Sequence, residues 1–170
     1  MGMIANYQLI NDEQLNRLKN LDAERDDVIE EVEEWNEEAE TLLDIDKMWD
    51  VLHFVLTGES ATEPIENNPL SEAVVGVQPL DNADFFISYT ESPRIAEILS
   101  ALEAFDIEQA MNTFSMEACK KAELYPNIWD YDEDEEVAEL KEEISDYIED
   151  MKHFYKEVLQ AHGNVMVSIY

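Results

Sequence analysis

The sequence predicts an α+β fold, in which several helices pack on a small mixed or antiparallel sheet that includes both chain termini. Near the amino end, residues 3–10 favour a pleated surface, and residues 165–170 at the carboxyl end do the same. Between these segments, apolar residues recur at helical spacing. An unpaired apolar strand at the carboxyl end would promote aggregation, so we expect it to lie within the sheet.

After the first strand, three helices are expected in the first half of the chain. Asn11 and Gln14 have the spacing of a capping box, which starts a helix directly after the strand. The third helix is expected to begin at residues 44–46 and to end at Gly58, a residue that favours the left-handed C-cap conformation. The second helix covers residues 23–40, and its apolar positions are Val28, Val32, Trp35 and Ala39.

A loop and a β-hairpin are expected in the middle of the chain. Prolines and asparagines oppose regular structure over residues 59–69. Residues 74–80 and 85–89 then read as two strands on either side of a turn at residues 81–82.

Helices are expected to dominate the remainder of the chain. Ser92 is expected as an N-cap with Pro93 at the first helical position, and Asp106 and Ser115 are expected to cap two short helices. The longest helix should then run over about residues 133–161. We find no repeat, linker or boundary, so residues 1–170 are expected to form a single domain.

The net charge is the strongest anomaly in the composition. Asp and Glu number 42 against 10 Lys and Arg, which gives a formal net charge of −32. Such a charge repels phosphate-rich partners, so we expect neither nucleic-acid nor anionic-membrane binding. The densest acidic stretch is residues 22–40, where Arg25 is the only basic residue. Binding of a basic partner would explain this density, and so would solubility or adaptation to high salt.

Cysteine content and terminal sequence indicate the cytoplasm. Cys119 is the only cysteine and so cannot form an internal disulfide. The amino end lacks the basic and apolar regions of a secretory signal, and no apolar run approaches the length of a membrane span. We therefore expect a soluble cytoplasmic protein.

The most informative segment is residues 43–58, a mostly apolar stretch with one thin polar stripe. The polar stripe consists of Asp46, Asp50, His53 and Thr57. On a continuous helix, these four residues would occupy a narrow arc beside the indole of Trp49. A carboxylate beside an imidazole suits acid/base or metal chemistry in a cleft. Alternatively, the stripe forms a buried network that is satisfied by internal hydrogen bonds.

Other recognisable sites are absent from the sequence. Asp130, Asp132 and Asp134 have the spacing of a calcium loop, but Glu135 stands where the loop needs glycine and Lys141 where it needs glutamate. The sequence has no P-loop, dinucleotide-binding, nucleophile-elbow or HExxH motif, and no second ligand pair at metal-binding spacing. We therefore expect no metal site and no cofactor.

Four blocks of the sequence resemble the bacterial YfbM-like family. They are MGMI at 1–4, LDIDKMWDVLHFVLTG at 43–58, NPLSEAVVG at 68–76 and YPNIW at 125–129. The resemblance runs from end to end and implies an α+β cytoplasmic domain without an established biochemical function. It supplies no catalytic role for the shared positions, which include Asp46, Lys47 and His53.

Charge favours one function over its alternative. We expect an uncharacterised, non-enzymatic, acidic protein-interaction module that binds a basic protein. One form of this function is that of an inhibitor or immunity partner of a basic toxin domain. The alternative is a small-ligand binder or enzyme that uses the polar cluster around Asp46, Asp50 and His53. The partner, the ligand, any reaction and the oligomeric state stay open at this point.

Overall fold

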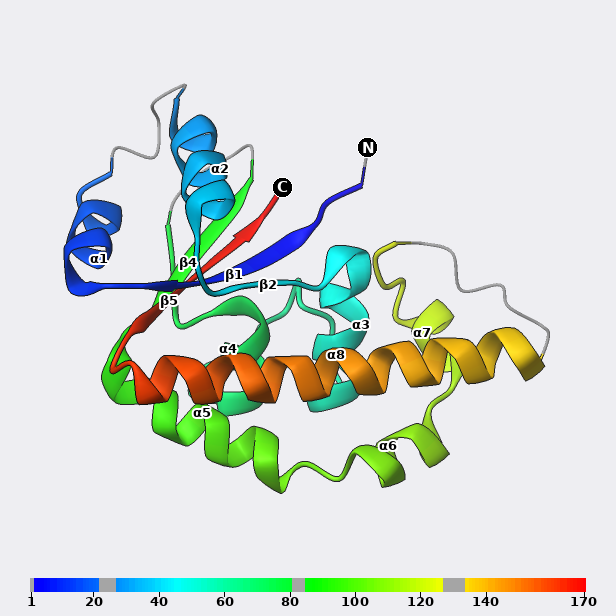
Figure 1. The fold of residues 1–170 in the computed structure, drawn as a ribbon. Coiled ribbons are helices and arrows are strands. Elements are labelled where there is room, and N and C mark those ends of the chain that lie inside the picture. Colours follow the sequence, from blue (N-terminus) through cyan, green and yellow to red (C-terminus); the bar gives the residue numbers. More distant parts are fainter. Residues whose placement is uncertain (1, 22–26, 81–84, 127–133) are drawn as a thin grey trace.

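A five-stranded antiparallel sheet lies at the centre of the computed structural model, which describes residues 2–21, 27–80, 85–126 and 134–170 (Figure 1). The order of the strands is β2-β1-β5-β4-β3. Their bounds are Ala5–Ile10 for β1, Leu42–Asp44 for β2, Gln78–Pro79 for β3, Phe86–Thr90 for β4 and Asn164–Ile169 for β5. β1 and β5 pair along their whole length, with Ala5 opposite Ile169. The predicted α+β class and the place of both termini in the sheet are confirmed.

Helices cover both faces of the sheet. α1 and α2 lie on one face, while α3, α4, α5 and α8 lie on the other (Figure 1). The helices are α1 (Asp12–Lys19), α2 (Val28–Glu38), α3 (Trp49–Thr57), α4 (Pro69–Val75), α5 (Ser92–Ala104), α6 (Ile107–Thr113), α7 (Met116–Lys121) and α8 (Asp134–Gln160). None of those in the described part of the chain is both long and apolar enough to cross a membrane.

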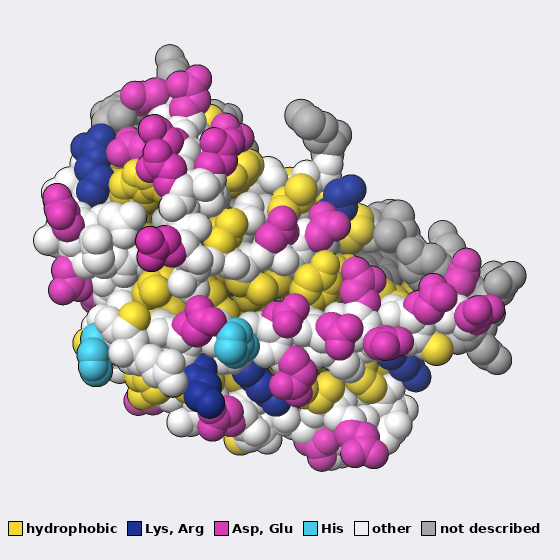
Figure 2. Space-filling view, viewed as in Figure 1, with side chains coloured by type: hydrophobic (Ala, Val, Ile, Leu, Met, Phe, Trp, Pro, Cys, Tyr) yellow, Lys and Arg dark blue, Asp and Glu magenta, His cyan; other side chains and the backbone are white. Residues whose placement is uncertain are grey.

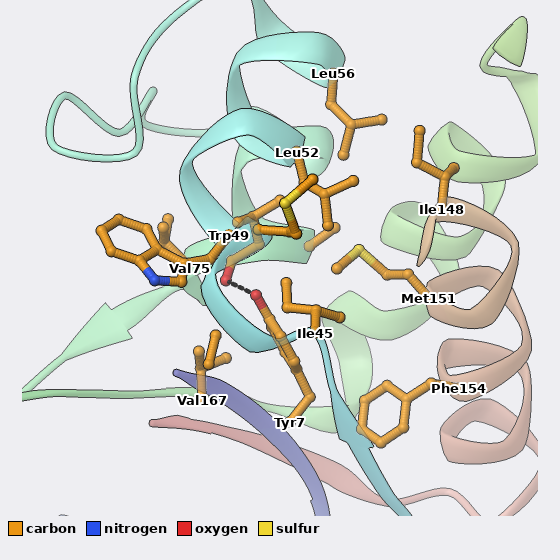
Figure 3. Close-up of a cluster of buried hydrophobic side chains, with 14 of the residues drawn as sticks. Tyr7, Ile45, Trp49, Leu52, Leu56, Val75, Ile148, Met151, Phe154 and Val167 are labelled. Atoms are coloured by element: carbon orange, nitrogen blue, oxygen red, sulfur yellow. Dashed lines mark hydrogen bonds between the residues drawn. The ribbon is translucent and has the colours of Figure 1, made fainter. Parts of the chain in front are cut away.

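The larger core fills the space between the sheet, α3 and α8. Figure 3 shows Leu52 and Leu56 of α3 among the side chains of Ile148 and Met151 of α8. Tyr7 enters the same core from β1, and its hydroxyl donates a 2.6 Å hydrogen bond to the carbonyl of Val74. This core packs α3 against the sheet.

Local capping signals account for many of the helix starts and ends. The Asn11 side chain accepts from the backbone of Gln14, whose own side chain accepts from the backbone of Asn11, so the predicted capping box is confirmed. Asp106 and Ser115 cap α6 and α7 as predicted. The long helix is confirmed as α8. The predicted start of the second helix, at residue 23, and the predicted turn at residues 81–82 both lie outside the described residues.

The helix predicted from residues 44–46 was wrong in its first turn. Residues 42–44 form β2, with Asp44 opposite Asn6 of β1, and a short 3-10 turn η1 (Asp46–Met48) precedes α3. Asp46 has a φ of 52°, which no α-helix accommodates. Pairing with β1 therefore overrides the helical periodicity of this segment.

The strand predicted at residues 74–80 was also mostly wrong. Asn68 caps a helix that Pro69 begins, and the Asn68 side chain accepts from the backbone of Leu70 at 3.0 Å. The helix, α4, ends at Gly76, which has a φ of 75°. Only Gln78–Pro79 pairs with β4, and this pairing is antiparallel.

The start of α5 differs from the prediction by one residue. Glu91, not Ser92, is the N-cap, so Ser92 is the first helical residue. The backbone N–H of Ser92 donates to Oδ1 of Asn164, 2.9 Å away on β5. A side chain distant in the sequence thus satisfies a free N–H of the helix, which no local pattern could predict.

Candidate functional site

The polar side chains of α3 lie inside the protein. Asp50 is 1% exposed and His53 is fully buried. Gly58 has a φ of 84° and ends α3, with its N–H bound to the carbonyl of Phe54 at 2.8 Å. From Gly58 the chain turns back, and residues 59–61 lie against the polar side of the helix.

The Asp50 carboxylate is held by three donors. Its Oδ1 accepts from the Ser60 hydroxyl at 2.8 Å and from the backbone N–H of Ala61 at 2.7 Å. Its Oδ2 accepts from the backbone N–H of Tyr125 at 2.7 Å. Three hydrogen bonds to one buried carboxylate compensate for its lost hydration. Asp50 therefore ties to α3 both the loop that follows this helix and the distant segment at Tyr125.

Both ring nitrogens of His53 also have partners. Nδ1 lies 2.7 Å from the carbonyl oxygen of Glu59, and Nε2 lies 2.7 Å from the hydroxyl of Ser71 on α4. A carbonyl can only accept, so we assign the proton to Nδ1, and Nε2 accepts from Ser71. Burial lowers the pKa of His53, which favours the neutral ring that this assignment requires.

The remaining stripe residues occupy three different settings. The Thr57 hydroxyl donates to the carbonyl of His53 at 2.7 Å and thus caps the end of the cluster. The Trp49 indole donates to the carbonyl of Met3 at 3.1 Å and stacks on Tyr125, with ring centroids 5.0 Å apart. Asp46 is exposed in η1, where its N–H bonds to the side chain of Asp44.

The structure brings Asp50, His53 and Thr57 together beside Trp49, and leaves Asp46 outside. The reason is the backbone: α3 begins only at Trp49, so Asp46 does not share its helical arc. We use the name polar cluster for the group that remains, which comprises Asp50, His53, Thr57, Ser60 and Ser71.

The sequence did not identify most partners of the polar cluster. Ser71 could have been found, because Asn68 and Pro69 form a helix-start pattern that would place Ser71 in the first turn of α4. Ser60 and Tyr125 carry no such signal, since a loop and a segment 75 residues away meet Asp50 only through the fold.

The chemistry available to the polar cluster is restricted by its burial. Every side-chain polar atom of Asp50 and His53 is hydrogen-bonded. Cys119 is buried too, and burial raises the pKa of its thiol to about 11, so it stays protonated at neutral pH. Across the described ranges, no group of three or more His, Cys, Asp or Glu is placed to hold a metal ion. The geometry is that of an internal network that ties α3 to its surroundings.

Some of the acidic residues that the sequence analysis singled out lie outside the described residues. Asp130 and Asp132 of the calcium-like spacing lie outside the described residues, as do Asp22, Glu24, Arg25 and Asp26 of the acidic stretch. Among the described residues of that stretch, Glu33, Glu34, Glu37 and Glu38 are exposed on α2.

Comparisons with known proteins agree with the resemblance noted above. Residues 1–168 match a family model described as "Domain of unknown function (DUF1877)". The chain is 36% identical to Protein YfbM of Escherichia coli (strain K12) over 129 residues, which cover 75% of each chain. It also resembles the crystal structure of YfbM from Escherichia coli, described as a protein of unknown function, with a TM-score of 0.80, 29% identity and coverage of 98% of this chain and 99% of that one. The chain is thus YfbM-like and belongs to the DUF1877 family.

Proposed function

We propose that this protein is a non-enzymatic, cytoplasmic interaction module that binds a basic protein through its acidic surface. The proposal includes the role of an inhibitor or immunity partner of a basic toxin domain. One observation carries it, the formal net charge of −32 on a chain of 170 residues. Charge of this density attracts a basic partner from a distance and accelerates association at low salt.

The distribution of the charge supports the proposal. Acidic side chains occupy much of the face in Figure 2, over α2 and along α8. Like charges at helical spacing repel one another and destabilise the isolated chain. Asp146 and Asp150 are such a pair, exposed and one turn apart on α8. A basic partner would relieve this repulsion, so binding and stability should be linked.

The alternative function requires polar atoms that are available to a ligand, whereas those of Asp50 and His53 have partners within the protein. A small-ligand binder or enzyme would need polar atoms that face a substrate. Asp50 and His53 instead direct theirs at Ser60, Ser71 and the backbone. Asp46, the third residue of that hypothesis, lies apart from them on the surface. The polar cluster therefore gives the alternative less support than the net charge gives to interaction through the surface.

Thermal denaturation over a range of NaCl concentrations tests the proposal. The Tm would be measured alone, with purified basic proteins from the source cell, and with acidic proteins from the same cell as the control. We expect one basic protein to raise the Tm at low salt, with an effect that fades as NaCl rises. A steep rise of the Tm with salt alone, with no shift from any basic protein, would contradict binding and leave salt adaptation as the cause of the acidity.

A further inference from the structure

A trough runs between the edge strand β2 and the long helix α8. It comprises a hollow of about 290 Å³ that is lined by residues of both elements. A second hollow of about 340 Å³ shares Asp150 with the first, and its described lining residues all lie on α8. In Figure 2, a band of hydrophobic side chains crosses this face with acidic side chains on both sides. We call this trough the acidic groove, and its principal lining residues are Leu42, Leu43, Glu143, Asp146, Tyr147, Asp150, Phe154 and Glu157.

One wall of the acidic groove is an open sheet edge. β2 pairs with β1 on one side only. The carbonyl of Thr41 and the N–H of Ile45 both bond to β1. Because backbone groups alternate in direction along an antiparallel strand, those of Leu42 and Asp44 point away from β1. Neither residue's backbone has a hydrogen-bond partner among the described residues.

An open edge of this kind can accept another strand. Unpaired N–H and C=O groups in a row are a template for an added strand, and native proteins usually cover or block them. Leu42 is 40% exposed, although it is a large apolar residue. Leu43 and Phe154 supply further apolar surface to the same hollow. The edge therefore offers backbone hydrogen bonds and an apolar contact to the same segment.

Negative charge comes from α8, which forms the other wall, and from Asp44 and Asp46 beside the strand edge. Burial and then the Asp46 carboxylate raise the pKa of Glu143. Burial raises the pKa of Tyr147 as well, followed by the charges of Glu143, Asp46, Asp44 and Asp150. Carboxylates of α8 and of the segment at residues 44–46 thus both act on the Tyr147 hydroxyl in the groove. The described residues that line the two hollows include no Lys or Arg, and His153 contacts Glu157 at 2.8 Å.

We propose that the acidic groove binds an extended basic segment of the partner protein, which adds to the open edge of β2 as a further strand. Side chains alternate along a strand, so Arg or Lys at every second position would face α8. Guanidinium groups suit both the carboxylates and the ring of Tyr147. The inference rests on the proposed function and specifies where, and in which conformation, the basic partner binds.

Charge also decides against the other occupants of such a groove. A second copy of this chain would bring another net charge of −32 and an equally acidic groove. A nucleic acid would be repelled for the same reason. A basic segment of a different protein is the occupant whose charge complements the acidic residues of α8 and those beside β2.

The test uses a synthetic peptide of about ten residues that alternates arginine and threonine, a length that exceeds the edge of β2. Its affinity for the full chain would be measured by calorimetry at low salt. The groove variant combines Asp146→Asn with Asp150→Asn. The control variant combines Glu103→Gln with Glu108→Gln, which removes the same charge from exposed sites on α5 and α6.

We expect the groove variant to weaken binding by at least about tenfold and the control variant by no more than about twofold. A peptide with N-methyl groups on alternate backbone nitrogens keeps its charge but cannot donate to the strand edge. When the methyl groups block the donors that face β2, we expect a loss of at least about tenfold.

Three results would overturn the inference. Equal losses in the groove and control variants would indicate binding by net charge alone. The N-methyl groups can be placed on either of the two alternating sets of backbone nitrogens. Undiminished binding of both of these peptides would exclude strand addition. Failure of the unmodified chain to bind the peptide would exclude the groove as a site for extended basic segments. The proposed function fails in a separate experiment, if no basic protein shifts the Tm. It survives if a partner binds the groove variant as tightly as it binds the unmodified chain.

Discussion

The polar cluster on α3 and the acidic groove beside α8 use similar residues in opposite ways. In the cluster, Asp50 is 1% exposed and is held by three donors. In the groove, Asp146 and Asp150 are exposed, and the backbone of Leu42 lacks a partner among the described residues. A polar group with internal partners stabilises the fold, whereas one left open is available for binding. The polar stripe of α3, which is the more conspicuous pattern in the sequence, therefore stabilises the fold and is not the proposed binding site.

The largest expected effect is the loss of the Asp50 carboxylate. Asp50→Asn keeps the shape but replaces one acceptor oxygen with a donor, which would then face another N–H or O–H. We expect the free energy of unfolding to fall by about 3 kcal/mol, measured by urea denaturation.

Asp46→Asn is the matched control for this change. It removes the same charge from an exposed residue, and asparagine tolerates the φ of 52° at this position. Its free energy of unfolding should stay at the level of the unmodified chain. Equal stability of the two variants would contradict a structural role for Asp50.

A smaller effect is expected from the titration of His53. Burial lowers its pKa below the ordinary value of about 6.5, so the unfolded chain binds a proton before the folded chain does. The contribution of His53 to stability is therefore fully present above about pH 6.5. It should decline as the pH falls further, with a slope of up to about 1.4 kcal/mol per pH unit.

Denaturation between about pH 7.5 and pH 5.5 would measure this slope. Carboxylates also titrate toward the acid end, so the informative quantity is the difference between the unmodified chain and His53→Gln. The control substitution is His153→Gln at an exposed position, which leaves His53 in place and should therefore keep the contribution of His53 to the slope. An unchanged slope in His53→Gln would show that burial does not hold this ring neutral.

The smallest effect is expected in the groove, and its sign is opposite. Asp146 and Asp150 lie four residues apart on α8, where like charges repel. Their replacement by asparagine should raise the free energy of unfolding by about 0.3 kcal/mol at low salt and by less at high salt. A substantial loss of stability would indicate that these carboxylates have structural partners.

Local signals predicted the elements that depend on neighbouring residues. The capping box at Asn11, the cap at Asp106 and the left-handed Gly58 are each decided within a few residues. The long helix α8 was predicted because its apolar positions recur over 27 residues. These features depend little on the rest of the fold.

Elements that depend on distant contacts were missed. β2 has three residues and exists through its pairing with β1, so its sequence alone resembles the start of α3. In the polar cluster, the stripe on α3 was predicted, but the link from Asp50 to Tyr125 was not. Spacing along a helix shows which residues share a face and leaves open what covers that face. The open edge of β2 was missed for the same reason.

Backbone amide chemical shifts during titration with the arginine–threonine peptide test the central claim most directly, because one spectrum reports on both regions. We predict that the largest changes occur at Leu42, Asp44 and residues 146–154, with slower hydrogen exchange at the first two. The amides of residues 59–61 and of Ser71 should stay unchanged. Changes centred on these amides, with β2 unaffected, would contradict the account and place binding at the polar cluster.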